Sequence, residues 1–306
     1  MYFQKTIQKE IQCSGIGLHS GTKVGLTLKP APAGTGIVFR RNDLDGFEIK
    51  AYADYISSLN FATSLAHQGV GVATTEHLLS AIFALGIDNL FVELDASEVP
   101  IMDGSSAPFI YLLHKAGIRT LSSIKEYIRI LHPISIYKQE KSISVYPSNE
   151  FRVTYAIKFQ HPLIQYQTYT LTILPETYSE SIAPARTFCF LKDVELMRKK
   201  GYANGGSLDN AVVLDEYGIL NDKLRFEDEF IRHKILDVVG DLALLGKPIL
   251  GHVVVYRGGH ALHSELVTKI LQSKESWVLE KSPALDAGEV GMKSLSSESS
   301  ILATSQ

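Results

Sequence analysis

The sequence predicts an α+β protein made of two domains, each a β-sheet with packed helices. The chain has 306 residues, more than an average single domain contains. Its 45% hydrophobic and 21% charged residues are ordinary for a globular protein with a core of normal size. Strand-like runs followed by two helices occur once in each half of the chain, and this repetition indicates two similar α+β units.

The first half of the chain alternates short strand-like runs with turn residues and then changes to helical periodicity. The first helix follows two threonines that can cap it, and Gly86 marks its end. The predicted elements are strands at 24–28, 36–39 and 89–94 and helices at 76–85 and 107–116.

The second half repeats this order with longer elements. Gly201 ends one predicted helix, and Gly246 ends another, with Pro248 shortly beyond it. The predicted elements are strands at 127–137, 142–145, 151–157, 166–171 and 252–256 and helices at 191–200, 226–245 and 261–272.

The domain boundaries follow from these two series. We expect a first domain at 1–122, a second at 127–275 and a C-terminal tail at 276–306. The end of the tail is rich in serine and shows no hydrophobic periodicity, so we expect it to be partly disordered.

Charge and cysteine content limit the compartment and the partners. The formal net charge of −3 gives no basic excess, so nucleic acid is not an expected partner. The start of the chain lacks the apolar core of a signal peptide, and no run approaches a membrane span, so we expect no stable membrane insertion. Cys13 and Cys189 lie far apart and outside any metal-ligand spacing. We therefore expect a cytoplasmic protein and a monomer.

The helix at 226–245 carries a row of ionisable residues beside its apolar stripe. His233, Asp237 and Asp241 follow each other at intervals of four, so they lie on one helix face. A histidine and an aspartate in this spacing can reach one metal ion. A hydrogen bond between them on a solvated helix face is the alternative explanation.

The helix at 76–85 places a second pair of such residues in its first turn. Glu76 and His77 point about 100° apart, so His77 can bind a metal while Glu76 stands beside it. Catalytic zinc takes three nitrogen or oxygen ligands and keeps one position open. His77, His233 and Asp237 supply such a set, and Asp241 can orient a neighbouring group. A further histidine, His260, follows a strand and a glycine-containing turn, where functional residues often occur.

These elements resemble UDP-3-O-acyl-N-acetylglucosamine deacetylase, which commits Gram-negative bacteria to lipid A synthesis. The resemblance covers about residues 1–275. It rests on motifs that occur in one order: G-I-G-L-H-S-G (15–21), T-x-E-H (74–77), I-D-N-L (87–90), P-I-M-D-G-S-S-A-P-F (100–109), A-R-T-F-C-F (185–190), G-G-S-L-D-N-A (205–211), R-F-E-D-E-F-I-R-H-K-I-L-D-V-V-G-D (225–241) and G-H-A-L (259–262). One departure is the segment at 61–64, which carries no cysteine where some family members have one near the metal.

The resemblance implies the fold, the activity and the cofactor. The helices of the two domains would face each other with one catalytic Zn²⁺ between them. Fe²⁺ is the alternative metal for this site in the cell. The reaction would be hydrolysis of the N-acetyl group of a UDP-linked acylated amino sugar, a small-molecule substrate. The segment at 190–206 would be an insert whose apolar channel receives the fatty acyl chain.

The resemblance also implies the roles of individual residues. The metal ligands would be His77, His233 and Asp237. The catalytic group would comprise Glu76 as general base, His260 paired with Asp241 as the second acid/base group, and Lys234 and Thr187 at the oxyanion. The substrate-binding group would comprise His19, Lys141, Phe159, Phe188 and Gly206.

Two other functions share parts of this pattern. Two histidines and a carboxylate also hold non-haem Fe(II) in oxygenases, but Glu76 and Lys234 beside the metal favour hydrolysis. A catalytically silent module that binds nucleotide sugars or lipids would be favoured if catalytic residues were missing, and all those named are present.

Overall fold

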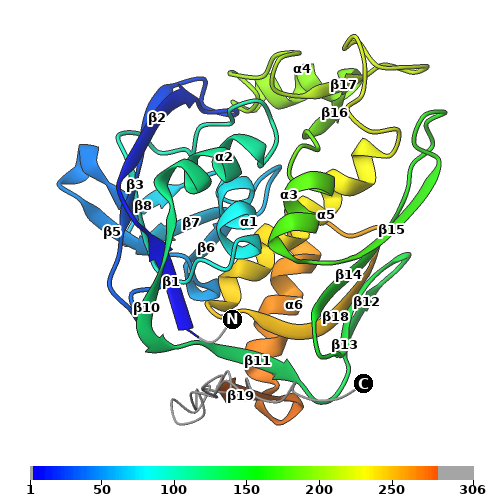
Figure 1. Ribbon diagram of the computed structural model, residues 1–306. Helices are drawn as coiled ribbons and strands as arrows, with labels where there is room; N and C mark the ends of the chain where they lie inside the picture. Colours follow the sequence, from blue (N-terminus) through cyan, green and yellow to red (C-terminus); the bar gives the residue numbers. More distant parts are fainter. Residues whose placement is uncertain (1–2, 282–306) are drawn as a thin grey trace, which may run out of the picture.

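The computed structural model describes residues 3–281 and has an α+β fold, as predicted. Two large sheets lie on the outside, and helices fill the space between them (Figure 1). In the first half the strands are β1 (Phe3–Ile7), β2 (Ile11–Ile16), β3 (Lys23–Pro30), β4 (Ile37–Arg41), β5 (Phe47–Lys50), β6 (Ile56–Ser58), β7 (Ser64–His67), β8 (Val70–Val72), β9 (Leu90–Leu94) and β10 (Ile118–Ile124). The helices of this half are α1 (Glu76–Ala84) and α2 (Ala107–Ala116).

The second half contains longer strands and the longest helices. Its strands are β11 (Glu126–Ile130), β12 (Ile134–Lys138), β13 (Lys141–Pro147), β14 (Phe151–Lys158), β15 (Tyr166–Thr172), β16 (Phe188–Phe190), β17 (Val212–Leu214), β18 (Ile249–Tyr256) and β19 (Trp277–Lys281). Its helices are α3 (Pro175–Ser181), α4 (Leu191–Lys199), α5 (Glu229–Leu242) and α6 (His260–Gln272). No helix among residues 3–281 is both long and apolar enough to cross a lipid bilayer.

Five strands of the seven-stranded second sheet repeat the strand order and the pairings of the five-stranded first sheet. In the first sheet the order is β2-β3-β9-β4-β5, with β9 antiparallel to β3 and parallel to β4. In the second sheet β12, β13, β18, β14 and β15 repeat this order, with β18 antiparallel to β13 and parallel to β14. A helix precedes and another follows each central strand, as α1-β9-α2 and α5-β18-α6. The predicted repeat is therefore confirmed, while the division into two domains stays a prediction.

The helices of the two halves pack face to face along α1 and α5. Gly240 allows this close approach, because a Cβ atom there would overlap the backbone of Glu76. Leu78 and Leu79 of α1 and Ile235 and Val239 of α5 are fully buried, and they belong to one core cluster with residues of both sheets. This contact between α1 and α5 brings the polar residues of the two helices together.

Several predicted boundaries are corrected by the structure. The strand predicted at 127–137 is two strands, β11 and β12, because Pro133 between them has no N–H to donate to a ladder. The helix predicted at 226–245 begins later, at Glu229, and its last turn is the 3₁₀ segment Ala243–Leu245.

The tail predicted from residue 276 also begins too early. Residues 277–281 form β19, which pairs with β11 in the second sheet, and the Trp277 indole donates to the carbonyl of Ile270 at 2.7 Å. The remainder of the predicted tail, 282–306, lies outside the described residues.

Candidate active site

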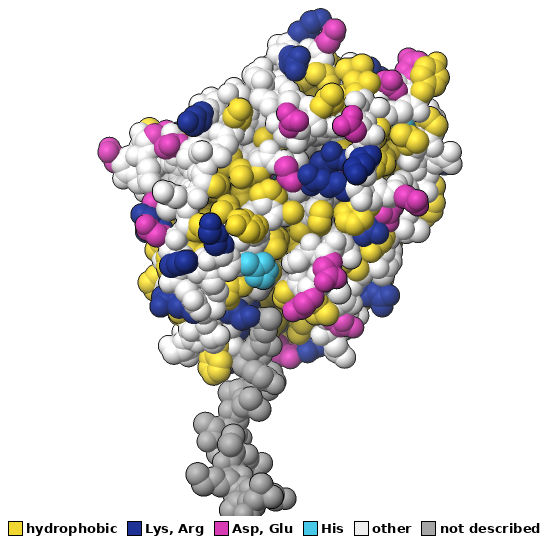
Figure 2. Space-filling model, turned by 45° about the horizontal axis from the view of Figure 1, so that its top comes forward, with side chains coloured by type: hydrophobic (Ala, Val, Ile, Leu, Met, Phe, Trp, Pro, Cys, Tyr) yellow, Lys and Arg dark blue, Asp and Glu magenta, His cyan; other side chains and the backbone are white. Residues whose placement is uncertain are grey.

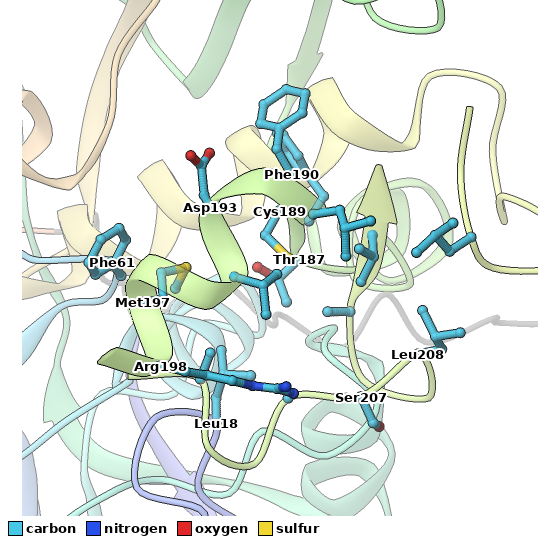
Figure 3. Close-up of a pocket in the computed structure, with 18 of the residues that line it drawn as sticks. Leu18, Phe61, Thr187, Cys189, Phe190, Asp193, Met197, Arg198, Ser207 and Leu208 are labelled. Carbon is cyan, nitrogen blue, oxygen red and sulfur yellow. The ribbon is translucent and has the colours of Figure 1, made fainter. Parts of the chain in front are cut away.

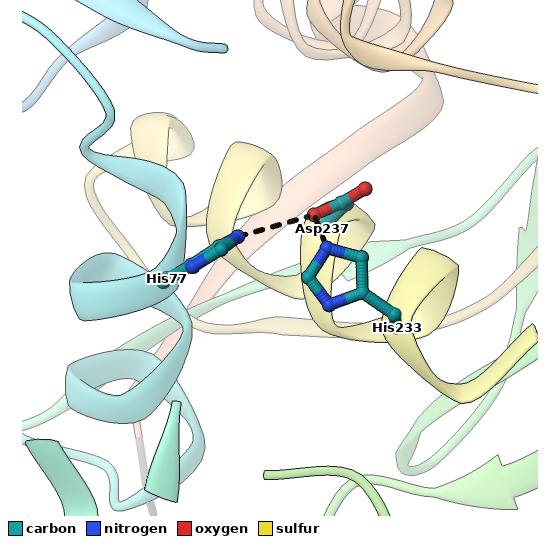
Figure 4. A group of neighbouring side chains, drawn as sticks. All are labelled: His77, His233 and Asp237. Carbon is teal, nitrogen blue, oxygen red and sulfur yellow. Dashed lines mark ion pairs between the residues drawn. The ribbon is translucent and has the colours of Figure 1, made fainter. Parts of the chain in front are cut away.

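A group of three potential metal ligands lies where α1 meets α5. His77 comes from the first turn of α1, while His233 and Asp237 are one turn apart on α5. Asp237 Oδ1 lies 3.3 Å from His233 Nε2 and 3.8 Å from His77 Nε2. The three side chains point toward one another (Figure 4), and one ligand atom from each lies within 4.8 Å of the others. These three residues therefore form a cluster that joins the two halves of the chain.

The protonation of these groups fits a divalent cation. His233 Nδ1 lies 3.1 Å from the carbonyl oxygen of Ala185, which can only accept, so Nδ1 carries the proton and Nε2 keeps its lone pair. Burial lowers the pKa of His233, and it lowers the pKa of His77 to about 3, so both rings are neutral. Burial alone would raise the pKa of Asp237, but Lys234 and the nearby histidines hold it well below its usual range. Two neutral imidazoles and one carboxylate match the ligand set of catalytic zinc.

The carboxyl group of Glu76 lies next to this cluster in α1. Its Oε2 accepts a hydrogen bond of 3.0 Å from the backbone N–H of Thr63. Burial raises the pKa of Glu76 to about 7, although the charge of His260 acts in the opposite direction. A carboxyl group in this condition can accept a proton near neutral pH.

His260 forms a hydrogen-bonded ion pair with Asp241. Nδ1 of His260 lies 2.8 Å from Asp241 Oδ2. Burial opposes a charge on the ring, but the Asp241 carboxylate outweighs it and raises the pKa of His260 to about 10. Burial also opposes ionisation of Asp241, yet the charge of His260 and the hydrogen bonds from two histidines lower the pKa of Asp241 to about 2. The pair therefore holds an imidazolium over the neutral range.

An apolar cavity of about 560 Å³ adjoins the metal-ligand cluster. Lys234 links the two, because its Nζ lies 2.6 Å from Asp237 Oδ2 and 5.4 Å from the centre of the Phe188 ring. Side chains from α4, from β16 and from the loops around Leu18 and Ser207 surround the cavity (Figure 3). Among the predicted residues, the cavity is lined by His19, Phe159, Thr187, Phe188, Gly206 and Lys234.

The cavity lies beside the part of the surface formed by α4 and the loops near β17. This end of the molecule comes forward in Figure 2, where hydrophobic side chains gather among charged ones. Leu191, Leu196, Leu208 and Leu220 line the cavity and are also exposed. An apolar passage with exposed apolar side chains at its border suits a long hydrocarbon chain.

Not all predicted site residues meet here, and two residues in the site were missed. Lys141 begins β13, where it is exposed, and it does not line the cavity. Thr63 and His263 both contact Asp241, although neither was a predicted site residue. His263 follows His260 at an interval of three on α6, and this spacing was an available signal. Thr63 lies in a loop between β6 and β7, where the sequence offers no periodic signal.

This arrangement defines a class of protein. A buried cluster of two histidines and a carboxylate, a neighbouring carboxyl group and an adjoining cavity on an α+β scaffold are the parts of a metal-dependent hydrolase.

Comparison with known proteins identifies the family within this class. The family described as LpxC, UDP-3-O-acyl N-acetylglycosamine deacetylase, matches residues 4–272, so the chain belongs to this family. A protein of Myxococcus xanthus named UDP-3-O-acyl-N-acetylglucosamine deacetylase is 49% identical over 272 residues, which cover 88% of this chain and 87% of the relative. Proteins of the same name from Syntrophus aciditrophicus and Coxiella burnetii are 44% and 46% identical, each over 90% of this chain and over 89% and 93% of the relative.

Proposed function

We propose that this protein hydrolyses the N-acetyl amide of UDP-3-O-acyl-N-acetylglucosamine. The products are acetate and UDP-3-O-acyl-glucosamine, and the reaction is the committed step of lipid A biosynthesis. The observation that carries this proposal is the metal-ligand cluster, which lies beside Glu76 and next to an apolar cavity. We also propose that the protein works in the cytoplasm as a monomer.

The proposed metal is one Zn²⁺ held by His77, His233 and Asp237. When bound, zinc polarises the amide carbonyl and lowers the pKa of a water molecule to about 7. The ligand set alone also suits Fe²⁺, but an oxygenase has no need of the carboxyl group of Glu76 beside the metal. The other alternative, a silent binding module, lacks support because each proposed catalytic residue is present.

The side chains around the cluster divide the proton transfers of hydrolysis. Glu76 takes the proton of the attacking water, since burial brings its pKa into the neutral range. Lys234 and Thr187 stabilise the negative charge that develops on the carbonyl oxygen. His260 donates a proton to the departing amine, and Asp241 keeps the ring charged until that step.

The substrate is held by the cavity and by the residues around it. Burial of the acyl chain contributes about 0.8 kcal/mol for each methylene removed from water. We assign Phe188 to packing on the sugar, and Phe159 and Lys141 to contacts with the nucleotide. His19 contacts a polar group of the substrate, because its buried imidazole lines the cavity.

The decisive experiment measures metal content and acetate release together. Zinc-loaded wild-type protein should release acetate from the UDP-sugar substrate. Asp237→Ala should lose metal and activity together, because it removes one of three ligands. Glu76→Gln should retain the metal and lose activity about a hundredfold or more, because only the base is removed. Zinc-loaded wild-type protein that releases no acetate would reject the proposal, and a metal-free Glu76→Gln protein would reject the assignment of roles.

A further inference from the structure

The Asp241 carboxylate is held on both of its oxygen atoms by residues outside the proposed catalytic group. Thr63 Oγ1 donates to Oδ1 at 2.6 Å, and His263 Nδ1 lies 2.8 Å from Oδ2. The second oxygen also accepts from His260 Nδ1 at 2.8 Å. A carboxylate can only accept, so all three groups are donors. Asp241 is therefore the meeting point of three hydrogen bonds, which come from the loop before β7 and from two positions on α6.

The contact that Nε2 of His263 makes determines whether its Nδ1 carries the donated proton. Its Nε2 lies 3.1 Å from the hydroxyl of Tyr155, a residue of β14. Burial raises the pKa of Tyr155 well above its usual value, so the phenol keeps its proton and donates it. Burial also lowers the pKa of His263, which leaves the ring neutral with one proton. Tyr155 therefore selects the tautomer in which Nδ1 carries the proton that Asp241 needs.

The surroundings hold this chain of contacts in place. Tyr155 and His263 are fully buried, and so is Thr63. Gly258 lies against the hydrogen bond between Tyr155 and His263. A Cβ atom at this position would lie 2.8 Å from the phenol oxygen and 3.1 Å from His263 Nε2. The glycine turn before His260 thus leaves room for the neighbouring hydrogen bond.

We propose that His263 is a positioning residue, which fixes the Asp241 carboxylate and through it the ring of His260. Tyr155 sets the proton on His263, and Thr63 holds Oδ1 of Asp241, the oxygen that the two histidines do not contact. The inference rests on the proposed function, because its effect on turnover requires His260 to act as the acid. Without His263, the carboxylate loses one donor and turns more freely, so His260 spends less time in the orientation that reaches the amine.

Two amide variants of His263 separate this role from simple packing. In His263→Asn the amide nitrogen takes the place of Nδ1 and still donates to Asp241, whereas the longer side chain in His263→Gln places its amide near the former position of Nε2. His263→Asn should therefore keep kcat within about threefold of wild type. His263→Gln should lower kcat about tenfold or more with KM little changed, because His263 does not line the substrate cavity. Tyr155→Phe removes one hydroxyl and should give a smaller loss in kcat.

Metal content and melting temperature are measured on every variant. Equal loss of kcat in His263→Asn and His263→Gln, or equal retention in both, would overturn the proposal and leave His263 as a packing residue. The tautomer is tested without activity by nitrogen-15 NMR of the histidine rings, in which His263 should carry its proton on Nδ1. A proton on Nε2 would also overturn it. Failure of wild-type protein to release acetate would instead reject the proposed function, and the NMR measurement would still decide the hydrogen-bond assignment.

Discussion

At the scale of single residues, burial and a neighbouring charge together set the pKa values of the two acid/base groups of the site. Glu76 and His260 are both withdrawn from water, yet their pKa values move in a way that burial alone does not explain. The pKa of Glu76 rises to about 7 because burial dominates, whereas the Asp241 carboxylate raises the pKa of His260 to about 10. Between these values Glu76 is ionised and His260 is protonated, which is the state that hydrolysis requires.

This separation predicts a bell-shaped dependence of kcat/KM on pH. Activity should rise through about pH 7 as Glu76 loses its proton and fall through about pH 10 as His260 does. Asp241→Asn should move the basic limb to lower pH, because the imidazolium loses the negative charge that stabilises it. His260→Gln should slow the reaction strongly and remove that limb, while metal content stays near the wild-type level. A basic limb that stays in place in both variants would assign it to another group.

The sequence was sufficient for some of these residues and not for others. His233, Asp237 and Asp241 recur at the helical period, and His77 follows Glu76 at a helix start, so local geometry groups the residues within each helix. The prediction that the two helices form one site rested on the ligand set of zinc and on the family resemblance. The acid/base pair of His260 and Asp241 came from a family resemblance, and the hydrogen bond between them agrees with it. Thr63 escaped prediction because its position depends on a loop that meets α5 across 178 residues of sequence.

At the scale of elements, α4 and the loop before β17 form the wall of the acyl cavity. Gly206 lies in this loop, where an added Cβ atom would be 3.4 Å from the Ala203 oxygen and 3.7 Å from the Leu18 side chain. Its backbone is outside the left-handed region that favours glycine, so a larger residue fits there and extends from a position on the cavity wall. The loop can therefore be tested without unfolding the protein.

Gly206→Leu should penalise the acylated substrate more than a substrate without the acyl chain. A side chain in the passage competes with the hydrocarbon, so kcat/KM for the long-chain substrate should fall about tenfold or more, which corresponds to about 1.4 kcal/mol. Gly218→Leu is the matched control, because a Cβ atom there meets open space and the residue does not line the cavity. Equal losses on both substrates would mean that this loop does not hold the acyl chain.

Helices and strands were predicted correctly where the residues that define them are neighbours in the sequence. Helix α2 was predicted with its observed ends, since its cap and its terminal glycine lie next to it in sequence. Strand β19 was placed in the tail, because nothing near Trp277 indicates that β11, far away in the chain, provides its partner. Helix α3 was missed for a related reason: it is short, and Tyr178 is its one buried residue.

At the scale of the whole molecule, the metal site ties the two halves of the chain together. His77 belongs to the first half, whereas His233 and Asp237 belong to the second, and the three groups meet only when α1 and α5 are packed. The unfolded chain does not hold these residues together, so a metal that binds here favours the folded state. The site is therefore expected to contribute to stability as well as to catalysis.

Removal of the metal should accordingly lower the melting temperature of the wild-type protein. A metal at a thousandfold excess over its Kd stabilises the folded state by about 4.1 kcal/mol. For a protein of this size, that energy corresponds to roughly six degrees in Tm, measured by calorimetry with and without a chelator. Asp237→Ala should melt at one temperature under both conditions, because it has lost a ligand. Glu76→Gln should retain most of the shift, because Glu76 is not a ligand. A shift of equal size in Asp237→Ala would place the stabilising metal at another site.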